Sequence, residues 1–153
     1  MQMNKGMTAK WNEIYDEIDL IELEPSLKSV LDGKFIESHG AVLLETLASN
    51  TLSLNQFEDI TRFEAISNKI HIKDYLNSCC DDKYALIQGL KYSIYLKEKL
   101  IQIKKPSRII LSLDPDSSEI SVKFFVIRQG KPYGSDNPED YQLEDIAIFD
   151  INN

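Results

Sequence analysis

Apolar and polar residues alternate over three stretches near the C-terminal end, and this period of two is typical of β-strands. We expect strands over residues 108–113, 119–128 and about 143–151. A short turn at 114–118 and a longer loop at 129–142 connect them. Apolar side chains occur on both faces of 119–128, so we expect this stretch to be the middle strand of a meander, covered at least in part on both sides.

Before residue 108 the apolar spacing is mostly helical. Trp11, Ile14, Tyr15 and Ile18 form one stripe on a helix that Thr8 can cap. The other expected helices are a short one after Ser26 that stops near Gly33, one over 39–48, one over about 54–66 behind the capping box Ser53-Leu54-Asn55-Gln56, one over 70–80, and a long one from Asp81 or Asp82 to about Lys104.

These patterns predict the α+β fold class, with a helical N-terminal two-thirds packed on a C-terminal three-stranded antiparallel meander. The chain has 153 residues, of which 42% are hydrophobic, and this is enough for one domain with a sizeable core. No internal repeat, low-complexity tract or linker divides it. We therefore expect residues 1–153 to form a single domain.

The formal net charge of −8 is unevenly placed. Residues 1–82 hold 15 acidic and 7 basic side chains, residues 83–113 hold 1 and 7, and residues 114–153 hold 9 and 3. The basic block falls on the end of the long expected helix, where positive charge is favoured by the helix dipole. The acidic blocks are either solvated faces or a surface for a basic protein partner. Direct nucleic-acid binding is disfavoured, because phosphate needs a net basic surface.

The sequence shows no targeting signal, and its two cysteines are adjacent, so we expect a cytoplasmic protein. The start of the chain has no apolar run of signal-peptide length, and no window approaches the roughly 18 apolar residues of a membrane span. Cys79 and Cys80 are neighbours in sequence, and disulfide geometry does not suit adjacent residues. Reduced, structural thiols and no membrane attachment are the expectation.

Spacing tests reveal no recognisable catalytic or metal site. His39, His71, Cys79 and Cys80 lack the spacing of a zinc site, and the six glycines form no phosphate-binding pattern. Ser38 and His39 are adjacent, but neighbouring side chains on a helix diverge. We expect no cofactor, no metal and no enzymatic activity.

The acidic turn after the first expected strand fits neither a calcium loop nor a nuclease core. Residues 114–119 lack the central glycine and the later bidentate Glu of a calcium loop. As a nuclease core, Pro115-Asp116 and Lys123 are too closely spaced, so a hairpin turn is the preferred interpretation. A small hydrolase or nuclease-like enzyme using Asp114, Asp116 and Glu119 stays open as an alternative.

The loop at 129–142 and the start of the last strand combine acidic and aromatic residues, as binding surfaces for basic proteins do. The partner-binding residues predicted there are Tyr133, Asp136, Glu139, Asp140, Tyr141, Glu144 and Asp145. A solvated loop is the plainer interpretation. A competing interface is the acidic side of the first helix, formed by Glu13, Asp16, Glu17 and Asp19.

Residues 70–150 contain a series of segments that resembles a known family. It runs from Ile70-His71-Ile72-Lys73-Asp74-Tyr75-Leu76-Asn77-Ser78 through a helix to the strand and Asp-Pro turn at 107–115, then to residues 124–130 and 146–150. This order is similar to that of immunity proteins of bacterial contact-dependent growth inhibition. The resemblance implies a protein that binds and occludes a cognate toxin domain without catalysis. An adaptor subunit of a larger complex is a further alternative.

Overall fold

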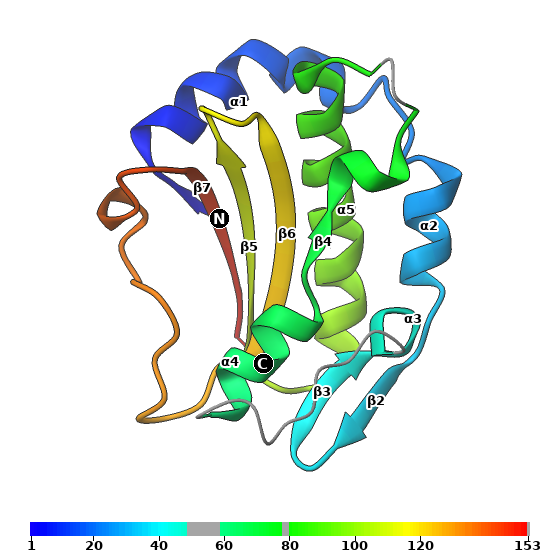
Figure 1. Cartoon of the computed structure of the whole chain (residues 1–153), viewed down its shortest axis with the longest axis vertical. Coiled ribbons are helices and arrows are strands. Elements are labelled where there is room, and N and C mark those ends of the chain that lie inside the picture. Colours follow the sequence, from blue (N-terminus) through cyan, green and yellow to red (C-terminus); the bar gives the residue numbers. More distant parts are fainter. Residues whose placement is uncertain (49–58, 78–79, 153) are drawn as a thin grey trace.

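The computed structural model describes residues 1–48, 59–77 and 80–152 and contains a five-stranded sheet, a separate hairpin and several helices (Figure 1). The strands are β1 (Gln2–Met3), β2 (Phe35–Ser38), β3 (Ala41–Leu44), β4 (Ile70–His71), β5 (Ser107–Asp114), β6 (Glu119–Val126) and β7 (Asp145–Ile151). The α-helices are α1 (Lys5–Ile18), α2 (Pro25–Leu31), α3 (Glu45–Ala48), α4 (Ile60–Ser67) and α5 (Asp82–Gln102), and short 3-10 turns are η2 (Ile72–Tyr75) and η3 (Pro138–Asp140).

The expected three-stranded meander is wrong. The sheet has the order β1-β7-β5-β6-β4, all antiparallel, so β5 is the central strand, and β6 lies between β5 and β4 rather than between β5 and β7. Strands β1 and β4 come from the region that we expected to be only helical. Each pairs through two residues, too few for an alternating pattern to be visible in the sequence.

The helix expected over residues 39–48 is also wrong. Strands β2 and β3 form a hairpin there, and only Glu45–Ala48 is helical. His39 and Gly40 have φ values of 52° and 82°, as a two-residue hairpin turn requires. The continuous apolar run of β3 misled the prediction, because a strand buried on both faces has no alternation to separate it from a helix.

Two other expected helices differ in extent. The segment expected to be helical over 70–80 contains β4 followed by the short turn η2, and residues 78–79 lie outside the described part. Helix α4 begins at Ile60 and is capped by Asp59, whose Oδ1 accepts from the Arg62 amide at 2.7 Å. The proposed capping box at 53–56 lies outside the described residues.

The first and the long helix are confirmed, although only one of their caps was predicted. Asp81 caps α5, as expected, by accepting from the Tyr84 amide at 2.7 Å. In α1 the cap is Asn4, whose Oδ1 accepts from the Met7 amide at 3.0 Å, and Thr8 lies inside the helix. Helix α2 begins after Glu24, with Pro25 at its first position, so Ser26 is not its cap.

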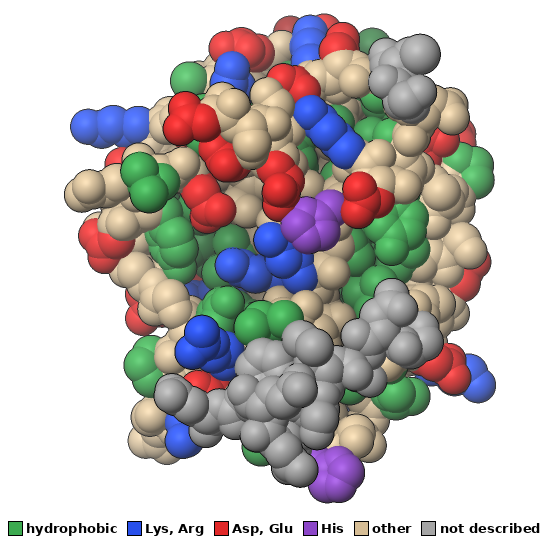
Figure 2. Space-filling model, in the orientation of Figure 1, with side chains coloured by type: hydrophobic (Ala, Val, Ile, Leu, Met, Phe, Trp, Pro, Cys, Tyr) green, Lys and Arg blue, Asp and Glu red, His purple; other side chains and the backbone are tan. Residues whose placement is uncertain are grey.

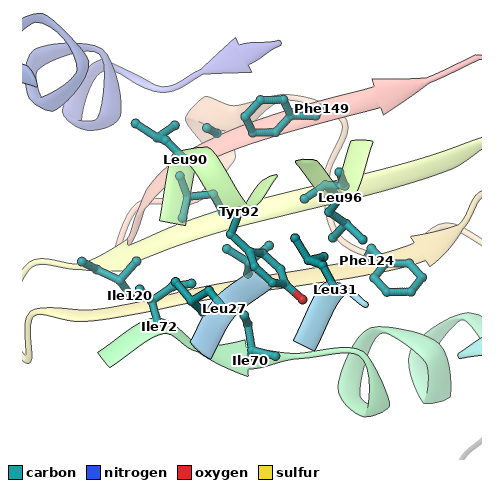
Figure 3. Close-up of a cluster of buried hydrophobic side chains, with 14 of the residues drawn as sticks. Leu27, Leu31, Ile70, Ile72, Leu90, Tyr92, Leu96, Ile120, Phe124 and Phe149 are labelled. Atoms are coloured by element: carbon teal, nitrogen blue, oxygen red, sulfur yellow. The ribbon is translucent and has the colours of Figure 1, made fainter. Parts of the chain in front are cut away.

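The main core lies between one face of the sheet and helices α1, α2 and α5. Ile109 and Leu111 of β5 and Phe124 of β6 point into it from the sheet. Figure 3 shows Tyr92 of α5 beside Leu27 and Leu31 of α2, and Tyr92 is only 2% exposed. Tyr92 was expected to fall outside the apolar stripe of this helix, whereas Ile94 and Ile101, expected inside it, are exposed.

The opposite face of the sheet is covered less completely. A small cluster of Ile110, Phe125, Ile146 and Ile148 packs there against Ala65 of α4 and against the loop before β7. In Figure 1 strands β5, β6 and β7 are in full view on this side, apart from their lower ends. We call it the open face. In the described part of the chain, no helix is long and apolar enough to cross a membrane.

Candidate functional site

The open face is hollowed at the end of the sheet where β5 turns into β6. A concavity of about 660 Å³ lies between that turn and the residues that lead into β7. It is lined by Asp114, Asp116, Asp140, Tyr141, Gln142, Leu143 and Glu144, which we call the acidic concavity. Figure 2 shows acidic side chains gathered over this end of the sheet, with Lys, Arg and His side chains below them.

One wall of the acidic concavity is the turn between β5 and β6, and Asp114 holds its shape. Its Oδ1 accepts from the Asp116 amide at 2.9 Å, and its Oδ2 accepts from the Ser117 hydroxyl at 2.7 Å. These hydrogen bonds, first that of Ser117, lower the pKa of Asp114 below its usual value. Asp114 is therefore a carboxylate at neutral pH and contributes negative charge rather than a transferable proton.

The other wall is the end of the 129–142 loop, which is tied by its own side chains. The Ser135 hydroxyl and the side-chain amide of Asn137 both donate to the carboxylate of Asp140. The Ser135 amide donates to the Tyr141 hydroxyl at 3.0 Å. Gly134 has a φ of 72°, and a side chain there would overlap the Tyr141 hydroxyl, so the sequence must have glycine at this turn. Tyr141 thereby supports the wall from inside.

Asn4 joins this wall to the first helix. Its side-chain amide donates to the carbonyl of Glu144 at 2.8 Å and to that of Tyr141 at 3.3 Å, while its Oδ1 accepts from the Ile146 amide at 3.1 Å. Asn4 is 6% exposed. Sequence reasoning missed this positioning residue, and only its suitability as a helix cap could have indicated it.

The structure brings only part of the predicted partner-binding set together. Asp140, Tyr141 and Glu144 line the acidic concavity, and Glu139 is exposed in η3 beside it. Asp136, although exposed, pairs with Nη1 of Arg108 at 2.7 Å, and Asp150 holds the same guanidinium from its other side.

Two of the predicted residues are directed elsewhere. Asp145 belongs to the other face of β7, where its carboxylate lies against Gly6 in the first turn of α1. Tyr133 is half-buried and packs edge-on against Phe125, with ring centroids 5.0 Å apart. Neither therefore faces a partner in the way that an exposed anchor would.

An apolar anchor does exist, at a position that we had not selected. Leu143 lines the acidic concavity with 86% of its surface exposed. We had assigned it to the last strand, which begins only at Asp145. The pattern of four polar residues around a single leucine was the available signal.

The acidic residues of the alternative, enzymatic hypothesis are Asp114, Asp116 and Glu119, and they do not share one site. Asp114 and Asp116 line the acidic concavity, whereas the carboxylate of Glu119 lies 2.8 Å from Nδ1 of His71 and 3.7 Å from the ammonium of Lys69. No group of three or more His, Cys, Asp or Glu side chains in the described ranges could hold a metal ion. Cys80 is a half-buried free thiol, and Cys79 is outside the described residues.

Comparison with known proteins identifies a family without adding a function. Neither the curated proteins nor the solved structures give a significant match to this chain. One family model matches residues 2–153, nearly the whole sequence. The chain belongs to this family, which is described as the uncharacterized protein PM0498 family.

Proposed function

We propose that this protein is an immunity-type inhibitor, which binds a basic toxin domain of a contact-dependent growth inhibition system through the acidic concavity and occludes it. The observation that carries the proposal is the convergence of Asp114, Asp116, Asp140 and Glu144 around an exposed leucine. The carboxylates steer a basic protein towards the surface, and Leu143 supplies apolar contact area.

The charge of the acidic concavity is available to a partner. Within the described ranges its four carboxylates form no ion pair with a lysine or arginine. The competing surface on α1 is partly neutralised, because Glu17 pairs with Lys83 at 2.5 Å and Glu13 lies 3.9 Å from Lys10. This difference favours the acidic concavity over the first helix as the interface.

Growth protection tests the proposal. A polypeptide encoded immediately upstream of this gene is expressed in a bacterial host, with and without this chain. We expect the upstream polypeptide to arrest growth and this chain to restore it. We also expect the purified pair to associate with a rate constant above the ~10⁵–10⁶ M⁻¹s⁻¹ of uncharged surfaces and to slow with added salt.

Matched charge variants locate the surface. One replaces Asp114, Asp116, Asp140 and Glu144 with Asn or Gln, and the control does the same at Glu13, Asp16, Glu17 and Asp19 of α1. The first set should slow association and abolish protection, and the second should do neither. Loss of binding in the helix set alone would assign the interface to α1 and contradict the proposed site.

A further inference from the structure

Lys123 lies on the open face beside the acidic concavity. It is a residue of β6, opposite Ile110 of β5, and its side chain points to the same face as Glu119 and Ser121. Its ammonium lies 5.5 Å from the centre of the Tyr133 ring. The negative charge of Glu144 is close enough to raise the pKa of Lys123. Lys123 therefore occupies the floor beside an acidic wall.

The ammonium of Lys123 is poorly compensated. The side chain is half-buried, and within the described residues it has neither a hydrogen-bond acceptor nor a carboxylate at ion-pair distance. Burial lowers its pKa and outweighs the charge of Glu144, which raises it, and the like charge of Lys69 acts in the same direction as burial. An aromatic ring attracts a cation but replaces none of its three hydrogen bonds.

The surroundings of Lys123 decide which anion suits it. The neighbouring carboxylates of Asp114, Asp116, Asp140 and Glu144 repel a polyanion such as nucleic acid. A basic protein surface that carries a single carboxylate is complementary both to the ammonium of Lys123 and to the carboxylates of the acidic concavity. Its lysines and arginines face the acidic concavity while the carboxylate reaches the ammonium.

We infer that Lys123 is a specificity-determining binding residue, which accepts one carboxylate from a partner surface whose surrounding side chains are basic. The inference rests on the proposed function, because it names the chemistry of the partner at that same surface. Lys123 then discriminates among basic partners, which the acidic concavity alone attracts without distinction.

Short peptides test the inference without a known partner. The probes are the capped peptides Lys-Lys-Asp-Lys-Lys and Lys-Lys-Asn-Lys-Lys. A neutral Ser-Ser-Asn-Ser-Ser peptide gives the background binding. The affinity of each peptide for the full chain is measured at low salt. The Asp peptide carries one additional negative charge, so its net charge is one unit lower and attraction to an acidic surface alone makes it the weaker ligand. We expect the reverse order, by about threefold to fivefold, which corresponds to one partly exposed ion pair.

Lysine variants assign the preference. Lys123→Met should restore the order of simple attraction, so that the Asn peptide binds more tightly, and Lys123→Arg should keep the wild-type order. Lys131→Met removes the charge of an exposed lysine in the neighbouring loop and should change nothing. Thermal melting confirms that each variant is folded.

Failure of the two ideas is distinguishable. If both basic peptides bind no better than the neutral one, the acidic concavity is not a basic-partner surface and the proposed function fails with the inference. If both basic peptides bind the wild type but the Asn peptide binds as tightly as the Asp peptide or more tightly, only the inference is wrong. The same holds if Lys123→Met still binds the Asp peptide more tightly. Lys123-dependent binding of a dT10 oligonucleotide would assign phosphate instead of carboxylate and overturn it.

Discussion

Glu64 of α4 receives both terminal nitrogens of Arg128 in a buried ion pair, with Nη2 to Oε1 at 2.7 Å and Nη1 to Oε2 at 2.8 Å. Glu64 is fully buried, and the same two oxygens accept from the amides of Val42 in β3 and Val126 in β6. Arg128 also donates to the carbonyl of Gly40. The pair therefore attaches the β2–β3 hairpin to the end of the main sheet.

Removing Arg128 should be strongly destabilising. Arg128→Met leaves a carboxylate buried without its counter-ion, and we expect the free energy of unfolding to fall by about 3–5 kcal/mol. Arg62→Met, on the exposed side of α4, is the matched control and should change it little. Urea denaturation measures both. Equal effects of the two variants would show that the ion pair contributes no more than a surface charge.

Asn4→Ala should affect both stability and the acidic concavity. It removes the cap of α1 and the two hydrogen bonds to the carbonyls of Tyr141 and Glu144, so we expect a loss of about 1–2 kcal/mol. Basic-peptide binding should weaken as well, although Asn4 does not line the concavity. Thr8→Ala, at the position first expected to be the cap, should leave binding unchanged. Unaltered peptide affinity in folded Asn4→Ala would remove its positioning role.

Charge reversal at Asp145 and at Glu139, which were both predicted to bind a partner, should change the melting temperature differently. Asp145→Lys puts a cation against the first turn of α1, where the helix dipole and the tight contact with Gly6 both oppose it, and the melting temperature should fall. Glu139→Lys changes an exposed side chain and should leave the melting temperature nearly unchanged. A similar fall in both variants would contradict the assignment of Asp145 to the helix-covered side.

Alkaline pH should weaken one link between helices. A hydrogen bond to Glu24, which precedes α2, is the main cause that raises the pKa of Tyr84 from 10.0 to about 12. Between these values the folded chain keeps a proton that the unfolded chain has lost, so the contribution of Tyr84 to stability is complete below pH 10 and disappears towards pH 12.

Denaturation of the wild type and Tyr84→Phe across this pH range measures the effect. Their difference in the free energy of unfolding should shrink as pH rises, whereas a difference that stays constant would show that the hydrogen bond does not depend on the tyrosine proton. Tyr95→Phe, on the same helix and 45% exposed, controls for the loss of a hydroxyl.

The sequence predicted elements with strong periodicity or a clear boundary and failed where pairing partners are distant. Helix α5 was predicted from its Asp81 cap to near its end, and the three long strands were found. Strand β1 was missed because Gln2 and Met3 pair as a strand with Ile148 and Ala147, far along the chain. Local pattern carries no information about such contacts.

The candidate site shows the same limit. The acidic character of residues 136–145 was visible, and Asp140 and Glu144 do share a concavity. What the sequence could not show is that β5 lies between β6 and β7, which brings Asp114 and Asp116 to the opposite wall. These two residues had been assigned to a rival, enzymatic hypothesis. Charge alone also grouped Asp145 with its neighbours, although the alternation of β7 directs it to the other face.

The pairing of β1 with β7 has a consequence for how the protein is made. The cap residue Asn4 completes its hydrogen bonds with the backbone of Tyr141, Glu144 and Ile146, which are synthesised 137 to 142 residues after it. Helix α1 and the acidic concavity are therefore finished together, after translation has delivered residues 145–151. A nascent chain that stalls before residue 140 lacks both the strand that pairs with β1 and one wall of the acidic concavity, so we expect the synthesis of residues 140–151 and the competence to bind to become one event.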